Sequence, residues 1–509
     1  MNRNRLIALN AIVVSATTVV NMVLSFVETR MFLQYYGTEI NGLIQSGNQI
    51  LNYIILFEGG LCSAYMYHMY QSIAESNRVS LSSYYAGFKK SIQQVVLRML
   101  GVAILISAIY PLVIKKGNLS YIFVFSVFSL LAAKVIIPYQ VTLVPKQMII
   151  LKEKKYVSEL ISGVTTAVIY VAEILVLKHT HFPVQILLLL CVLISFSSGM
   201  VYQLLMKRFY KDEISGAVHP NYTPNKMSKD VMAHTISGLI FGSTDNVILS
   251  ILASLNEVTI YSNYMMLIRN SGALINKLLD GATATLGIKI ARNDTNSYEI
   301  FKELLSSAMF LGTIITSSYV VLINDFIRLW VGKEYCVGYI DIVLFAIILF
   351  CNIILAALQP LVSAGGKFKE SKRFTIIQAI ANLIITIILV PFCGLTGALL
   401  GTALARVFIS VPCNYRIINK YIFPEKQLSW NDIICTSMIT IALSVFGVFI
   451  NNRFLDGLYQ NLNWIVFFAK ASAIILSILL VSFVFFYLID GSFKKLVNRI
   501  LKLLVQKKS

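Results

Sequence analysis

Four basic side chains lie deep within long apolar segments of the sequence, where charge is costly. They are Arg269, Arg406, Lys134 and Lys277. A guanidinium binds phosphate through two parallel hydrogen bonds, and a cation at membrane depth faces a bundle interior or a water-filled cavity. These residues are therefore candidates for binding an anionic group. A buried ion pair is the alternative for Arg269, with Asp245 on the preceding segment as partner, and the two roles are compatible.

Other polar residues recur on single faces of the same segments when each residue is turned by 100°. Hydrogen bonds between helices explain any one of them, but stripes on the leading segments of both halves favour a shared polar cavity. Three acids, Glu58, Asp245 and Glu173, are also candidates for carrying a coupling ion, H⁺ or Na⁺. The cavity candidates are Asn21, Glu28, Asn48, Asn52, Glu58, Glu173, His234, Asp245, Asn276 and Asp280.

The segments that carry these residues are long enough to cross a bilayer. Hydrophobic residues make up 57% of the 509 residues and charged residues 13%, a composition outside the range of soluble domains. We expect an all-α integral membrane protein with about fourteen transmembrane helices. The predicted spans are 7–27, 43–66, 93–114, 119–140, 159–178, 183–206, 230–252, 258–286, 303–325, 337–360, 373–391, 394–417, 432–450 and 464–488.

Basic residues alternate along the connections between these spans. Most of the 43 Lys and Arg fall at the two termini and in the even-numbered connections, which the positive-inside rule places in the cytoplasm. The basic residues that give the net charge of +19 thus set the membrane topology and face anionic lipid headgroups. We therefore expect no nucleic-acid partner. Two further basic residues within spans, Arg98 and Lys470, are expected to extend toward the membrane surface.

The spans divide into three predicted domains. Residues 1–215 form a six-helix lobe, residues 216–425 a second lobe in parallel repeat, and residues 426–509 a two-helix addition with a basic cytoplasmic tail. The external connections are short, the longest being about residues 28–42, so no catalytic domain fits outside the membrane. The sequence has no phosphate-binding Gly loop, metal-ligand cluster or nucleophile elbow. We therefore expect no catalytic residues, no metal and no cofactor, which favours transport.

Several short motifs are spread over residues from about 10 to 425. The most specific pair is Thr244-Asp245-Asn246 with Tyr261-Ser262-Asn263-Tyr264. The others are Ser25 to Arg30, Tyr36 to Leu43, Phe57 to Leu61, Leu329 to Gly332 and Gly394 to Thr402. Together they resemble the motifs of bacterial polysaccharide repeat-unit flippases. Lipid II flippases are similar near Val23 to Gly37, but they carry Arg-Asp where this chain has Glu28-Thr29. No lipid II contact is therefore expected from that helix.

This resemblance implies a two-lobe fold like that of multidrug and toxin extrusion (MATE) transporters. It also implies a polyprenyl-diphosphate-linked oligosaccharide as substrate, moved from the cytoplasmic to the outer leaflet of the bacterial cytoplasmic membrane for O-antigen, capsule or exopolysaccharide synthesis. The diphosphate would bind the four basic residues, and the pathway's polymerase and glycosyltransferases would be partners.

Two alternatives remain. A multidrug extruder of the same fold would favour an excess of acids over cations in its cavity, whereas the central charges here are mixed. A membrane glycan polymerase or ligase is opposed by the short external connections.

Overall fold

The computed structural model of the chain is mostly helical in the part that it describes. It describes residues 3–58, 60–115, 117–152, 154–180, 182–210, 214, 219–225, 244–291, 296–365, 367–426, 428–452 and 462–506. Within these ranges there is no strand, and ten helices are long and apolar enough to cross a membrane. The chain forms two compact units, Met1–Thr259 and Ile260–Ser509, here called unit 1 and unit 2.

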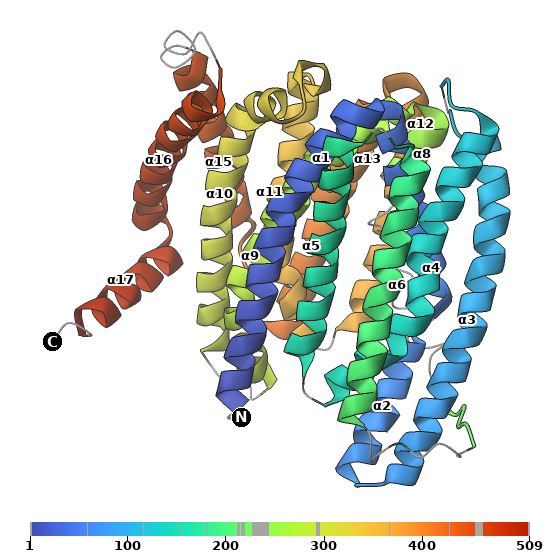
Figure 1. Cartoon of the computed structure of the whole chain (residues 1–509). Helices are drawn as coiled ribbons and strands as arrows, with labels where there is room; N and C mark the ends of the chain where they lie inside the picture. Colours follow the sequence, from blue (N-terminus) through green and yellow to red (C-terminus); the bar gives the residue numbers. More distant parts are fainter. Residues whose placement is uncertain are drawn as a thin grey trace. The chain divides into compact units, whose positions relative to one another are not determined.

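Unit 1 is a bundle of long helices, and short turns join those that lie before residue 210 (Figure 1). Its core lies mainly between α3, α4 and α6, where Phe88, Phe128 and Tyr202 are almost fully buried. Its elements are α1 (Arg3–Ile55), η1 (Leu56–Glu58), α2 (Leu61–Ala74), α3 (Arg78–Val113), α4 (Tyr121–Leu151), α5 (Lys155–His179), α6 (Val184–Phe209), α8 (Asp245–Leu252) and the first residues of α9 (Leu255–Ala291).

The first two spans differ from the sequence prediction. An external loop at 28–42 was expected, and this is wrong, because helix continues on both sides of a single kink at Gly37. Gly37 has φ 80° and ψ −178°, a conformation open to glycine because it lacks a Cβ. The second span is in turn broken after Ile55, and α2 restarts behind Gly60, which is left-handed at φ 73°. The second span is therefore a discontinuous helix.

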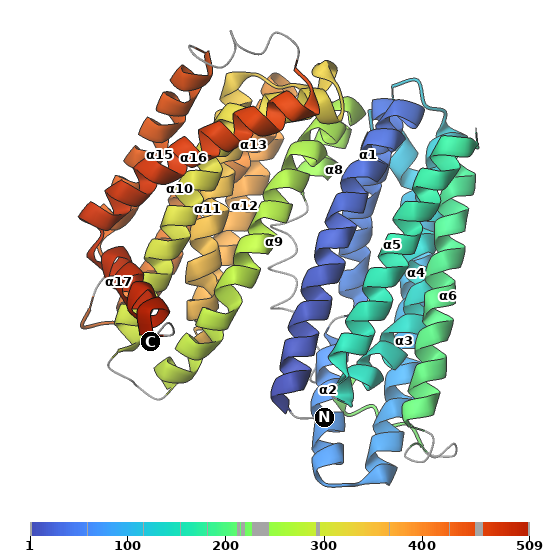
Figure 2. The same cartoon turned by 60° about the vertical axis from the view of Figure 1, so that its left-hand side comes forward.

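Helices α1 and α5 lie side by side in both views (Figures 1 and 2). Their close approach depends on Gly163, where an added Cβ would lie 2.5 Å from the Thr17 Cβ. Small residues allow helices to approach closely in membranes, where van der Waals packing drives association. The face of α1 that carries its polar residues therefore packs against α5.

Unit 2 contains the rest of α9 and the remaining helices. They are α10 (Ser297–Trp330), η2 (Lys333–Tyr335), α11 (Tyr339–Ala364), α12 (Phe368–Cys393), α13 (Leu395–Ala405), η3 (Arg406–Ser410), α14 (Val411–Ile417), η4 (Ile418–Ile422), α15 (Trp430–Ile450), α16 (Trp464–Ile489) and α17 (Gly491–Gln506). The twelfth predicted span, 394–417, thus lies within one continuous helical path, which contains the π-helical turn η3 and runs on past residue 417 into a second one, η4.

The pair α15 and α16 packs on α10 through a separate apolar cluster. Its centre includes Ile314 and Leu322 of α10 with Leu443, Ile474 and Ile478 of the pair. After α16, the predicted basic tail contains the further helix α17.

The prediction of an all-α membrane protein with about fourteen spans is confirmed. Of the seventh span, only the part from α8 onward falls within the described residues. The domain boundaries at 215/216 and 425/426 stay predictions.

Candidate functional site

In unit 2, the face of α9 that carries the predicted anion ligand Arg269 has exposed polar side chains. Arg269 and Asn276 are both exposed, whereas Ser262, further toward the start of the same face, is buried. At the membrane depth predicted for α9, exposed Arg and Asn would face water rather than lipid, because lipid cannot satisfy their donors. This part of α9 is therefore a candidate for a polar, water-accessible surface of unit 2.

Unit 1 has an exposed polar face of its own on the second half of α1. Asn48 and Asn52, one helical turn apart, are both exposed there. Ser46 points the other way, and its hydroxyl lies 2.6 Å from the Tyr110 hydroxyl inside the bundle. The two asparagines are thus accessible to a polar substrate or water, and their role in a cavity stays a prediction.

A charged cluster lies inside unit 1, where four helices meet. Lys134 Nζ of α4 is 3.9 Å from Glu173 Oε1 of α5, and the Cys191 thiol of α6 donates to the same oxygen at 3.1 Å. Glu28 of α1 interacts electrostatically with both Lys134 and Glu173. The Thr29 hydroxyl donates to Glu28 Oε2 at 3.3 Å. Two carboxylates thus share one ammonium, an arrangement suited to holding a proton or a monovalent cation.

Polar residues of α1 and α5 lie at contacts between helices of unit 1. Asn21 Nδ2 donates to the Gly163 carbonyl at 3.1 Å, and the Ser162 hydroxyl lies 2.9 Å from the Tyr202 hydroxyl. These residues therefore join helices within unit 1, which is the simpler of the two roles considered for such stripes.

Glu58 has a local structural role. Its Oε1 accepts from the Cys62 backbone N–H at 2.9 Å, and its Oε2 accepts from the Tyr139 hydroxyl at 3.0 Å. The carboxylate thereby satisfies a donor at the start of α2, where the helix dipole favours negative charge. The break in the second span is stabilised by this contact.

The remaining candidates are spread over both units. Arg406 is half-buried and begins the π-helical turn η3 of unit 2. Asp245 opens α8 in unit 1 and interacts with Tyr53 of α1. Because Asp245 and Arg269 belong to different units, their ion pair stays a prediction. His234 and the side chains of Lys277 and Asp280 lie outside the described residues.

The expectation that Lys470 extends to the membrane surface is wrong. Its side chain is 3% exposed, and its Nζ lies 2.7 Å from Asp325 Oδ2 of α10. Asp325 was missed as a candidate. One signal was available in the sequence, since a lysine inside a strongly apolar span requires an acidic partner and Asp325 lies at the end of the predicted ninth span. Arg98, by contrast, is exposed on α3 as expected.

Unit 2 also contains an apolar cavity of about 590 Å³ between α10, α11, η3, α14 and α15. Phe350, Ile354 and Val407 line it from one side, and Ile433 and Val445 from the other. The hydroxyls of Ser437 and Ser444 also reach it, but both donate to carbonyls of their own helix. The lining is thus mostly apolar, and it suits a hydrocarbon.

Several residues of the family-like motifs have structural roles. The Tyr264 hydroxyl donates to Asn324 Oδ1 at 2.7 Å and accepts from the Val337 N–H at 3.2 Å, and its ring stacks on Phe345. Thr396 similarly donates to Asp341 Oδ1 at 2.6 Å. These motifs therefore hold α9, α10, α11 and α13 together. Among the described residues, no His, Cys, Asp and Glu side chains are grouped so as to hold a metal ion.

Comparisons with known proteins identify the fold. No family model matches the sequence, and no curated protein matches it. Among solved structures, the lipid II flippase MurJ in an inward closed conformation superposes with a TM-score of 0.70 at 14% identity, covering 94% of this chain and 99% of MurJ.

Two MATE transporters are also similar. An inward-facing multidrug resistance transporter of the MOP superfamily gives a TM-score of 0.58 at 11% identity, over 85% of this chain and 99% of its own. The eukaryotic transporter AtDTX14 gives 0.51 at 13% identity, over 86% and 99%. The chain therefore has the MATE-like fold that these lipid flippase and drug transporter structures share.

Proposed function

We propose that the protein flips polyprenyl-diphosphate-linked oligosaccharides from the cytoplasmic to the outer leaflet by alternating access, for surface polysaccharide synthesis. The observation that carries this proposal is the pairing, within unit 2, of a cationic polar surface with an apolar cavity. A lipid-linked glycan requires both surfaces, because its diphosphate is charged and its polyprenyl chain is hydrocarbon.

The cavity supports the lipid part of this assignment. Its volume of about 590 Å³ lies in the range of ligand pockets, and α15, part of the C-terminal helix pair, supplies one wall. A hydrocarbon chain in contact with this wall would remain in an apolar environment while its headgroup crosses the membrane.

Arg269 supports the phosphate part. It is exposed on the polar face of α9, and its planar guanidinium binds phosphate oxygens in pairs. Arg406 begins a π-helical turn, a feature frequent at functional sites. We assign Arg269 to the diphosphate, with Arg406 and Lys277 of unit 2 as further cations, and we place both termini in the cytoplasm on the basis of the loop charges.

The direct test is leaflet accessibility of a lipid-linked glycan in vesicles with and without the purified protein. We expect the protein to expose the glycan at the opposite leaflet. Transport of organic cations without glycan exposure would instead identify a multidrug extruder.

A variant pair on α15 tests the cavity itself. Ser437→Trp would fill the cavity and slow flipping of a long-chain substrate by roughly tenfold, while a short-chain analogue is unaffected. Met438→Trp is the matched control, because the neighbouring Met438 is 66% exposed and lies outside the cavity lining. Equal effects of the two substitutions would contradict the assignment of the cavity to the lipid chain.

A further inference from the structure

A second hollow, here called the α17 groove, lies at the end of unit 2 where α10 and α15 begin and α16 ends. It has a volume of about 630 Å³ and is lined by residues of α10, α15, α16 and α17, with Lys426 from the segment before α15. It is separate from the apolar cavity described above, with which it shares no lining residue.

One wall of the α17 groove is apolar. Phe485, Phe486 and Ile489, at the end of α16, line it together with Met309 and Ile439. Ile489 is 61% exposed, and α16 is one of the helices long and apolar enough to cross a membrane. A hydrocarbon chain in the adjacent bilayer can therefore lie along this wall.

Four acids also line the α17 groove, and most of them are engaged. Asp432 pairs with Lys302 at 3.5 Å, and Glu303 pairs with Arg499 of α17. Asp490 Oδ1 accepts from two backbone N–H groups at the start of α17. The fourth acid that lines the groove, Glu299, is exposed on the first turn of α10.

Two exposed lysines also line the α17 groove, Lys426 and Lys495. Lys426 Nζ lies 5.7 Å from the centroid of the Tyr298 ring, and Tyr298 is another lining residue. These ammonium groups stand beside the apolar wall, as the phosphate and the acyl chain of a phospholipid stand beside each other.

The helix α17 places the groove at the membrane–water boundary. Its apolar residues Phe493, Leu496 and Val497 recur on one face of the helix, and Lys495 and Lys502 occupy the other. Phe493 is buried against Phe310 of α10 and Phe486 of α16, with ring centroids 4.7 Å and 5.7 Å away.

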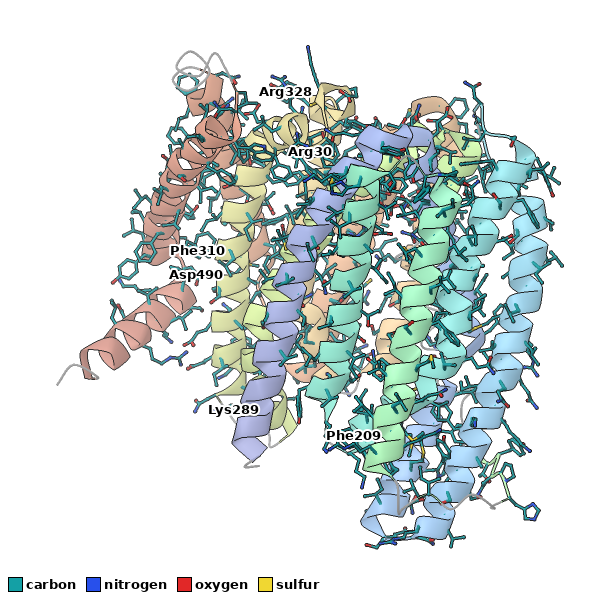
Figure 3. All side chains as sticks on the ribbon, in the orientation of Figure 1. Arg30, Phe209, Lys289, Phe310, Arg328 and Asp490 are labelled. Atoms are coloured by element: carbon teal, nitrogen blue, oxygen red, sulfur yellow. The ribbon has the colours of Figure 1, made fainter. Side chains whose placement is uncertain are left out.

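Figure 3 labels Phe310 and Asp490 at this junction. A basic amphipathic helix that follows a membrane span lies in the plane of the interface and is attracted by anionic lipids. The lysines of the α17 groove therefore lie at headgroup depth.

We propose that the α17 groove binds one anionic phospholipid of the adjacent leaflet. Its phosphate contacts Lys426 and Lys495, and one acyl chain lies along Phe485 and Ile489. The bound lipid bridges the segment before α15 to α17 and fixes α17 against α10 beside the Glu303–Arg499 pair. This site is independent of the substrate proposed above.

Lipid binding to the delipidated full-length protein tests the proposal. Phosphatidylglycerol and phosphatidylcholine with identical acyl chains are titrated and followed by native mass spectrometry. We expect one phosphatidylglycerol to bind about tenfold more tightly than phosphatidylcholine, because each lysine near a headgroup adds a favourable charge interaction. Equal affinity for the two lipids would overturn the proposal.

Paired variants locate the site. Lys426→Gln combined with Lys495→Gln should remove the preference for phosphatidylglycerol, whereas Lys89→Gln combined with Lys90→Gln, on exposed lysines of α3, should keep it. Ile489→Trp should weaken binding of both lipids, and Leu488→Trp should not, because the neighbouring Leu488 is 74% exposed and does not line the groove. An unchanged preference in the groove double variant would exclude the site.

Discussion

The charged cluster of unit 1 and Arg269 of unit 2 differ in exposure. In unit 1, Glu28, Lys134 and Glu173 come together within the bundle, where two carboxylates share one ammonium. In unit 2, Arg269 is exposed on the outside of its bundle. A charge turned inward at membrane depth holds helices together or carries a small ion, whereas one turned outward is available to a large substrate.

This comparison assigns different tasks to residues that look alike in the sequence. Unit 2 also has an inward-facing pair, Lys470 with Asp325, so the distinction concerns orientation rather than the unit. Substitution of inward-facing groups should lower stability, and substitution of outward-facing groups should lower transport.

The largest effect is expected for Lys470→Met. It leaves Asp325 without its ammonium partner, and breaking a buried pair costs about 3–5 kcal/mol. Thermal unfolding in detergent should show a clear loss of stability. Lys470→Met combined with Asp325→Asn is the control and should recover most of it. A single variant as stable as the wild type would show that the pair does not hold α16 to α10.

For the outward-facing Arg269, we expect loss of transport with normal stability. Arg269→Ala should slow flipping about 10- to 100-fold, because hydrogen bonds to a charged group contribute about 1.5–3 kcal/mol. Arg269→Lys should recover little, since the paired hydrogen bonds are lost. The readouts are glycan accessibility in vesicles and the unfolding temperature.

Arg269 also permits a test of its predicted partner. If Arg269→Ala and Asp245→Asn destabilise the protein equally, and the double variant restores folding without transport, Arg269 serves both as an ion-pair partner and as a phosphate ligand. Normal flipping by both Arg269 variants would contradict the assignment of Arg269 as a ligand of the substrate's phosphate.

In unit 1, Glu173→Gln should lower the free energy of unfolding by about 1–3 kcal/mol, because the contacts with Lys134 and the Cys191 thiol are weakened. Flipping per folded molecule should be retained. If stability is unchanged while flipping loses its dependence on an ion gradient, the cluster is a coupling site instead, and the comparison between inward and outward groups has to be revised.

The smallest effects are expected on stability, and they distinguish two asparagines of α1. Asn21→Ala removes the hydrogen bond to the Gly163 carbonyl and should cost about 1 kcal/mol. Asn48→Ala, on the exposed face, should change stability by less than about 0.5 kcal/mol. Denaturation of the two variants under identical conditions measures the difference, and a reversed order would contradict the orientation of α1.

The spans could be predicted because apolar length and loop charge depend only on composition along the chain. The kink at Gly37 could not, because a glycine between apolar segments suits a loop as well as a bent helix. Periodicity placed Asn21 and Asn48 on polar faces, but whether such a face meets another helix depends on packing partners far along the chain. Lys470 and Asp325 lie 145 residues apart in the sequence, so their pairing could be identified only from the folded structure.

The π-helical turn that begins at Arg406 has a mechanical consequence. Such a turn accommodates one surplus residue while the backbone groups stay hydrogen-bonded. If the surplus moves by one position, the helix beyond it rotates relative to the helix before it, and no bare carbonyl is presented to lipid. The helical path from α13 through α14 can therefore rotate at this turn. The rotation moves Arg406 relative to the cavity wall while the helix remains unbroken.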